Sequence, residues 1–140
     1  MYKVCKTFKV PIGHRLSKHK GLCKNIHGHN LKIEVELMTE VLNWNDMVID
    51  FHKLKEEVNK TLDKYDHTTL FNIKDVENAE FFTQAGYRVE YISPLDQDPT
   101  AEVFSHFLYR VLSERFRMDD IKVGFVRIWE NDDSYAEYSE

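Results

Sequence analysis

The chain has 140 residues, of which 42% are hydrophobic, and its formal net charge at pH 7 is -5. This length and composition predict a single domain over residues 1–140, and the negative charge argues against general nucleic-acid binding. No apolar run approaches the roughly 20 residues that cross a bilayer, and the two cysteines, Cys5 and Cys23, make no disulfide framework, so we expect a cytoplasmic protein.

The first predicted element is a half-buried strand over residues 2–10, where apolar and polar side chains alternate. Pro11 is expected to end regular pairing, and residues 11–28 are predicted to form a long, functional loop. Between residues 15 and 24 this loop has basic residues and no acid, which suits either an anion such as a phosphate chain or a plain solvated loop. The basic residues are Arg15, Lys18, Lys20 and Lys24.

A Cys-x3-His-Gly-His motif ends this loop. Side chains two apart in an extended chain point to the same side, so His27 and His29 can offer two imidazoles to one cation. His14 is the candidate third ligand, because its segment would lie beside the next strand if the two pair as antiparallel neighbours. Three histidines leave zinc an open position, as in catalytic sites. If Cys23 binds the metal, the site is closed and structural; if the thiol stands apart, it is free to act as a base or nucleophile.

A second strand and a helix are predicted next. Residues 31–38 alternate strictly, and Asp50 is placed to cap a helix that should end near residues 63–66. The pair Asp66-His67 then offers a carboxylate beside an imidazole, the groups that proton transfer needs. Such pairs also arise by chance, and a histidine at the end of a helix is often only a partner of the helix dipole.

An insertion at about residues 72–98 follows, in which residues 77–84 suggest a helical turn and residues 87–92 a short strand. A second main helix is predicted to start at Asp98-Pro99-Thr100-Ala101-Glu102, with Asp98 or Thr100 as its cap and an apolar face facing the core.

Two strands are predicted to end the chain, over residues 121–130 and 134–139. Glu130 closes a mostly apolar strand, where a carboxylate needs a partner: either a ligand edge that it binds through two hydrogen bonds, or a local arginine or lysine. The predicted order is ββααββ. It favours an α+β fold with a four-stranded antiparallel sheet and two helices on one face.

Together these motifs resemble the 6-pyruvoyltetrahydropterin synthase family. The resemblance covers nearly the whole chain, in order, through His14, Cys23-x3-His27-Gly28-His29, Asp50-Phe51-x2-Leu54, Asp66-His67, Pro99-Thr100-x-Glu102 and Glu130. The three-residue gap between Cys23 and His27 resembles the branch that makes 6-carboxy-5,6,7,8-tetrahydropterin on the route to queuosine. The 6-pyruvoyl-forming branch typically has a longer gap.

The resemblance implies a tunnelling fold, in which subunits close their sheets into a barrel and two trimers stack as a homohexamer with active sites between subunits. It implies Zn²⁺ as the cofactor, held by His14, His27 and His29. It also implies 7,8-dihydroneopterin triphosphate as the substrate, whose side-chain hydroxyls the metal would make more acidic.

The same resemblance implies a role for each remaining motif. Cys23, Asp66 and His67 would be the catalytic residues that move and relay a proton, and Glu130 and Thr100 would bind the pterin. The implied enzyme is a zinc-dependent carbon–carbon lyase that releases triphosphate and acetaldehyde and forms 6-carboxytetrahydropterin. The alternatives are a 6-pyruvoyltetrahydropterin synthase, which only eliminates triphosphate, and a non-catalytic, zinc-stabilised pterin-binding protein.

Overall fold

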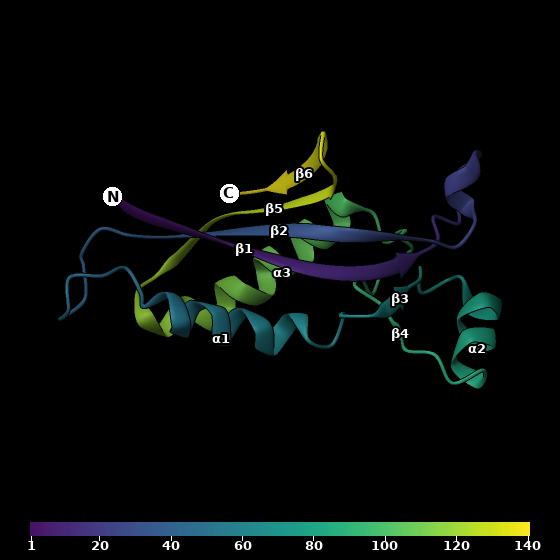
Figure 1. The fold of residues 1–140 in the computed structure, drawn as a ribbon, viewed down its shortest axis with the longest axis horizontal. Coiled ribbons are helices and arrows are strands. Elements are labelled where there is room, and N and C mark those ends of the chain that lie inside the picture. Colours follow the sequence, from purple (N-terminus) through teal and green to yellow (C-terminus); the bar gives the residue numbers. More distant parts are fainter.

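One sheet of six strands, in the order β4-β3-β1-β2-β5-β6, organises the computed structural model, which describes residues 1–140. Helices α1 and α3 pack against each other and against this sheet, whereas α2 lies beside the short strands at one end of the molecule (Figure 1). The elements in chain order are β1 (Tyr2–His14), η1 (Leu22–Lys24), β2 (His27–Thr39), α1 (Phe51–Leu62), β3 (Thr68–Leu70), α2 (Val76–Gln84), β4 (Val89–Glu90), α3 (Ala101–Phe116), η2 (Arg117–Asp119), β5 (Lys122–Asn131) and β6 (Ser134–Tyr138).

The antiparallel pairing of β1 with β2 is confirmed, but both strands are longer than expected. The pairing runs from Tyr2 opposite Thr39 to His14 opposite His27, so the expectation that Pro11 ends it was wrong. The amide nitrogen and carbonyl of a strand residue point to the same side. The Pro11 carbonyl accepts from the His67 amide at 2.9 Å, on the side of β3, so the missing N–H of Pro11 costs no hydrogen bond to β2.

The predicted helix starts and core faces are also confirmed. The Asp50 carboxylate accepts from the His52 amide at the start of α1, and the Thr100 hydroxyl accepts from the Val103 amide at the start of α3. The apolar faces of both helices join those of β1, β2 and β5 in one core of 24 buried residues. This core fixes the strands whose ends carry the histidines.

The predicted four-stranded antiparallel sheet with order ββααββ was wrong, although the α+β class holds. Strands β3 and β4 add to the β1 edge in parallel orientation, and α2 is a third helix. The suggested helical turn at residues 77–84 and short strand at residues 87–92 are confirmed as α2 and β4. Strand β3 has three residues, too few for an alternating pattern to be recognised. No helix combines the length and the apolar character that crossing a membrane would need.

Candidate metal centre

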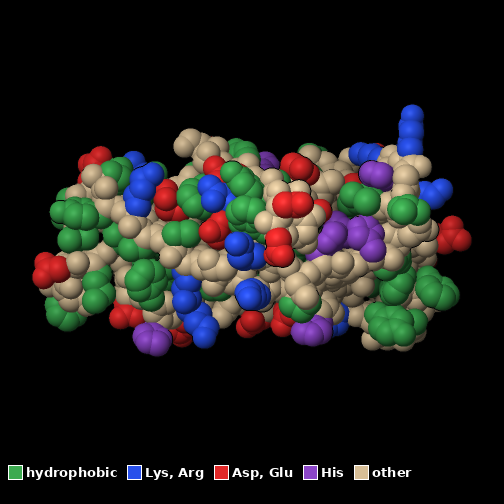
Figure 2. Space-filling view, turned by 45° about the horizontal axis from the view of Figure 1, so that its top comes forward, with side chains coloured by type: hydrophobic (Ala, Val, Ile, Leu, Met, Phe, Trp, Pro, Cys, Tyr) green, Lys and Arg blue, Asp and Glu red, His purple; other side chains and the backbone are tan.

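Three histidine side chains meet at one end of the sheet. His14 lies opposite His27, and His29 lies two residues further along β2, so the three side chains share one face of the sheet. The same face carries the buried apolar residues of both strands, so the hydrophobic rows of β1 and β2 end in imidazoles. The three ligand nitrogens all lie within 4.8 Å of one another. Histidine side chains gather in a patch in Figure 2, toward the end that carries α2 in Figure 1.

Backbone carbonyls fix the orientation of two of the rings. Nδ1 of His14 donates to the Pro99 carbonyl oxygen at 2.8 Å, and Nδ1 of His27 donates to the Asn25 carbonyl oxygen at 2.8 Å. A carbonyl oxygen only accepts, so in the neutral rings each Nε2 is left with a lone pair. The two Nε2 atoms lie 2.9 Å apart. Facing lone pairs repel each other unless a cation lies between them, so this cluster fits a metal ion.

Burial keeps His14 in the form that binds metal. The side chain is 2% exposed, and burial lowers its pKa to about 4, although the hydrogen bond to Pro99 acts in the opposite direction. A neutral imidazole is the form that ligates metal. His27 and His29 are half-buried, so the centre is open to solvent on their side.

The Cys23 thiol stands outside the histidine cluster. Cys23 lies in the η1 turn, is half-buried and is not one of the side chains whose ligand atoms form the group. Its carbonyl oxygen accepts from the Leu16 amide at 3.1 Å, which closes the β1–β2 loop on itself. This arrangement is the one expected of an open centre with a separate thiol.

Glu130 and Thr100 share a cleft next to the histidines. The cleft has a volume of about 230 Å³ and lies between the start of α3 and the β5–β6 hairpin. Glu130 occupies the irregularity in pairing between Trp129 and Asn131, and its Oε2 lies 3.8 Å from Nε2 of His29. No lysine or arginine forms an ion pair with Glu130, so its carboxylate remains available at the cleft.

Asp66 and His67 form a pair of their own on the surface. The Asp66 Oδ1 accepts from Nδ1 of His67 at 2.7 Å, and the side chains are 46% and 76% exposed respectively. His67 has a φ of 54°, in the left-handed region, at the tight passage from α1 into β3. No hydrogen bond or ion pair joins either side chain to Cys23 or to the three histidines, so within one chain the predicted catalytic residues are not assembled.

Comparisons with known proteins identify the family of this chain. The family model described as 6-pyruvoyl tetrahydropterin synthase matches residues 3–140. The chain belongs to this family. It is 30% identical to a 6-carboxy-5,6,7,8-tetrahydropterin synthase of Aquifex aeolicus over 99% of this chain and 98% of that protein. It is 29% identical to a protein of the same name from Haemophilus influenzae over the full length of both.

Solved structures show the same fold. An uncharacterized protein from Wolinella succinogenes superposes with a TM-score of 0.82 at 21% identity, covering 99% of this chain and 97% of that one. The 6-pyruvoyl tetrahydropterin synthase of Caenorhabditis elegans superposes with a TM-score of 0.72 at 24% identity, covering 99% and 95%. The mixed sheet with β3 and β4 therefore belongs to the α+β fold of the family.

Two basic residues of the β1–β2 loop form ion pairs, which reduces the positive charge available to a ligand. The Arg15 guanidinium pairs with Asp75 at 2.7 Å, and Lys18 Nζ pairs with Asp96 at 3.3 Å. Of the basic residues in this loop, Lys20 and Lys24 form no ion pair. The loop is thus a weaker anion site than the sequence suggested.

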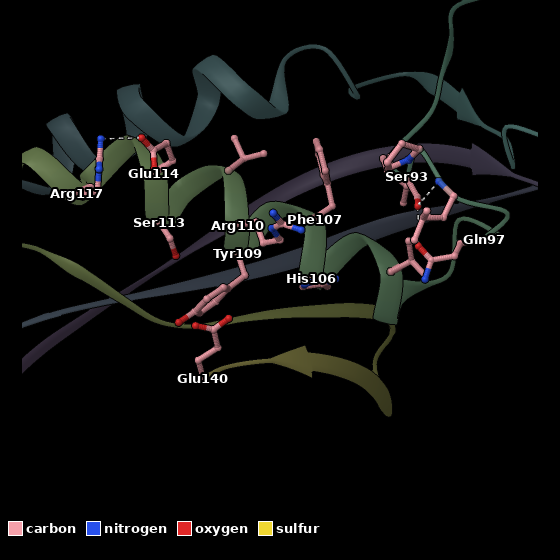
Figure 3. A pocket seen from close by; sticks show the side chains of 15 residues that line it. Ser93, Gln97, His106, Phe107, Tyr109, Arg110, Ser113, Glu114, Arg117 and Glu140 are labelled. Carbon is pink, nitrogen blue, oxygen red and sulfur yellow. Dashed lines mark hydrogen bonds and ion pairs between the residues drawn. The ribbon is translucent and has the colours of Figure 1, made fainter.

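Two features of the site were missed in the sequence. The Pro99 carbonyl that orients His14 and the buried Asp98 carboxylate belong to a segment interpreted only as a helix start. No local pattern signals these contacts, because they join residues more than 80 positions apart. A separate cleft of about 880 Å³ runs along α3 between residues 92–97 and Glu140, and none of the predicted site residues lines it (Figure 3).

Proposed function

We propose that this chain is a zinc-dependent 6-carboxy-5,6,7,8-tetrahydropterin synthase. It would convert 7,8-dihydroneopterin triphosphate and release triphosphate and acetaldehyde, on the route to queuosine. The observation that carries the proposal is an open group of three histidines with the Cys23 thiol close by in sequence but outside the group. The names of the relatives from Aquifex aeolicus and Haemophilus influenzae support the same reaction.

Zinc suits the donor set, because imidazole nitrogen is one of its preferred ligands and three protein ligands are typical of its catalytic sites. When bound, the ion supplies Lewis-acid polarisation of the hydroxyl groups on the substrate side chain. His14, His27 and His29 hold it, and the carbonyls of Pro99 and Asn25 keep two of these rings in the ligating orientation.

Cys23 removes and returns a proton at the side-chain carbon of the substrate. Its position on the η1 turn, outside the ligand group, leaves the sulfur free for this role. Asp66 and His67 relay the proton, and because they are exposed and apart from Cys23 in one chain, they act on the site of a neighbouring subunit.

Glu130 anchors the pterin. A carboxylate accepts two parallel hydrogen bonds from an amino-pyrimidine edge, and the Glu130 carboxylate is unpaired by lysine or arginine at the cleft that Thr100 also lines. Because Oε2 of Glu130 lies 3.8 Å from Nε2 of His29, a ring bound by Glu130 would lie beside the three histidines.

The proposed assembly is a homohexamer built from two trimers. Strands β4 and β6 are the two edges of the sheet, and edges of this kind are usually paired or covered. Pairing between subunits would close the sheets into a barrel and bring Asp66 and His67 of one subunit to Cys23 of the next.

The test is a product assay with zinc-loaded protein and 7,8-dihydroneopterin triphosphate. The proposal expects 6-carboxytetrahydropterin and acetaldehyde in equal amounts. Formation of 6-pyruvoyltetrahydropterin alone would assign the chain to the other branch. Binding of a pterin with zinc in place and no turnover would overturn the enzymatic proposal in favour of a binding protein.

A further inference from the structure

The loop that carries Cys23 is held by a buried carboxylate from a distant part of the chain. Asp98 is 8% exposed, and its Oδ1 accepts from the Ser17 hydroxyl at 2.6 Å. Its Oδ2 accepts from the Lys18 amide at 2.8 Å. The side chain of Asn72, which is 1% exposed, donates to the same carboxylate at 3.1 Å. Three donors converge on one buried acceptor, so Asp98 has few alternatives to this arrangement.

Backbone hydrogen bonds within the loop connect the residues that Asp98 binds to Cys23. Ser17 and Lys18 lie in a turn in which the His19 amide donates to the Leu16 carbonyl at 3.0 Å. The Leu16 amide donates in turn to the Cys23 carbonyl at 3.1 Å. The carboxylate therefore holds one side of a closed loop whose other side carries the thiol.

The same chain segment also touches the metal centre. Pro99, which follows Asp98, provides the carbonyl that binds Nδ1 of His14 at 2.8 Å. A second tie joins the loop to the start of α2, where Arg15 pairs with Asp75, a side chain that is 8% exposed. The segment 72–98 and the residue after it thus contact both the thiol loop and a metal ligand.

The charge of Asp98 is maintained in this setting. Burial by itself raises the pKa of the carboxyl, but the hydrogen bonds from Ser17, Lys18 and Asn72 outweigh it, and the pKa lies below its usual value. Asparagine at position 98 would replace one carboxylate oxygen with an NH2 group. That group cannot accept a hydrogen bond from Ser17, Lys18 or Asn72. At least one of the three hydrogen bonds would be lost.

We propose that Asp98 is a positioning residue that fixes the Cys23 thiol relative to the three-histidine centre through Ser17 and Lys18. This inference rests on the proposed role of Cys23 as the proton-transferring group. The segment 72–98 is then part of the active-site scaffold, because it supplies Asn72 and Asp75 as well as Asp98.

The parent protein for this experiment is the zinc-loaded chain with Cys5→Ser, in which Cys23 is the one remaining thiol. The experiment compares this parent with the same protein carrying Asp98→Asn. Iodoacetamide measures the reactivity of Cys23, steady-state kinetics measure kcat and KM, and elemental analysis measures zinc. Asp119→Asn, an exposed carboxylate in η2, is the matched control.

For Asp98→Asn we expect kcat to fall about 100-fold while KM and zinc content stay close to those of the parent, because a misplaced reacting group costs rate rather than binding. Alkylation of Cys23 should become about tenfold faster as the loop opens locally. Ser17→Ala removes one donor and keeps the carboxylate, so it should change kcat and the alkylation rate in the same directions by smaller factors. It replaces Asp98→Asn in the test if that variant does not fold.

Parental kcat and alkylation rate in both variants would overturn the proposal. Loss of zinc together with activity would also overturn it, since Asp98 would then act on His14 and not on Cys23. If the parent protein shows no turnover, the proposed function fails, yet the alkylation rates still decide whether Asp98 holds the thiol.

Discussion

Nε2 of His14 and Nε2 of His27 face each other at 2.9 Å while Nδ1 of each ring donates to a backbone carbonyl. The fold thus brings two lone pairs together and orients them before any ligand binds. His29 joins them from the next position on the same face of β2. A cation relieves this repulsion, so metal binding and folding stability should be coupled.

Removal of the metal should therefore destabilise the protein. A ligand at 1,000 times its dissociation constant stabilises a fold by about 4 kcal/mol, so a chelator should lower Tm markedly, and added zinc should restore it. His29→Ala should bind little zinc, show no turnover and have a Tm that the chelator does not change. His52→Ala, at an exposed position of α1, should behave as the parent does. An unchanged parental Tm after full removal of the metal would contradict this coupling.

Cys23→Ala should abolish turnover and leave about one zinc per chain, because the thiol lies outside the histidine group. Elemental analysis and the product assay measure both effects on the same sample. Cys5→Ala, which alters an exposed cysteine of β1, is the control and should keep both properties. A Cys23→Ala protein that loses its zinc would show that the thiol is a ligand.

Subunit complementation tests the proposed position of Asp66 and His67. Cys23→Ala and His67→Ala should each be inactive as pure assemblies. When the two variants are coexpressed, random mixing should leave roughly a quarter of the sites with both groups intact if neighbouring subunits share each site. Activity should then reappear in the mixed assemblies. Complete inactivity of mixed assemblies, verified by two different affinity tags, would place both residues in the same chain's site.

Glu130→Gln should weaken binding of the pterin ring. Loss of a charge-assisted hydrogen bond costs about 1.5–3 kcal/mol, which corresponds to a roughly 10- to 100-fold larger dissociation constant. Titration of the zinc-loaded protein with a non-reactive pterin measures this constant. Glu114→Gln, in an exposed ion pair on α3, should bind the pterin as the parent does. Equal affinities in both variants would remove Glu130 from the pterin site.

The parts of the fold that rest on regular patterns could be predicted from the sequence. Alternation predicted β2, helical spacing and an acidic cap predicted α1, and the two-residue spacing of His27 and His29 predicted a shared ligand face. Strand β4 lies within the short strand suggested at residues 87–92, but β3 and the parallel pairing of both strands could not be predicted, because three and two residues carry no pattern that specifies a partner. The buried contacts of Asp98 join residues about 80 positions apart, and no local spacing encodes them.

X-ray absorption at the edge of the resident metal tests the central claim most directly, namely an open three-histidine centre with a free thiol. We predict zinc surrounded by light atoms at about 2.0–2.1 Å, with the multiple scattering of imidazole and no sulfur neighbour. A sulfur neighbour at about 2.3 Å would make Cys23 a ligand and the site a closed, structural one. That result would contradict the account.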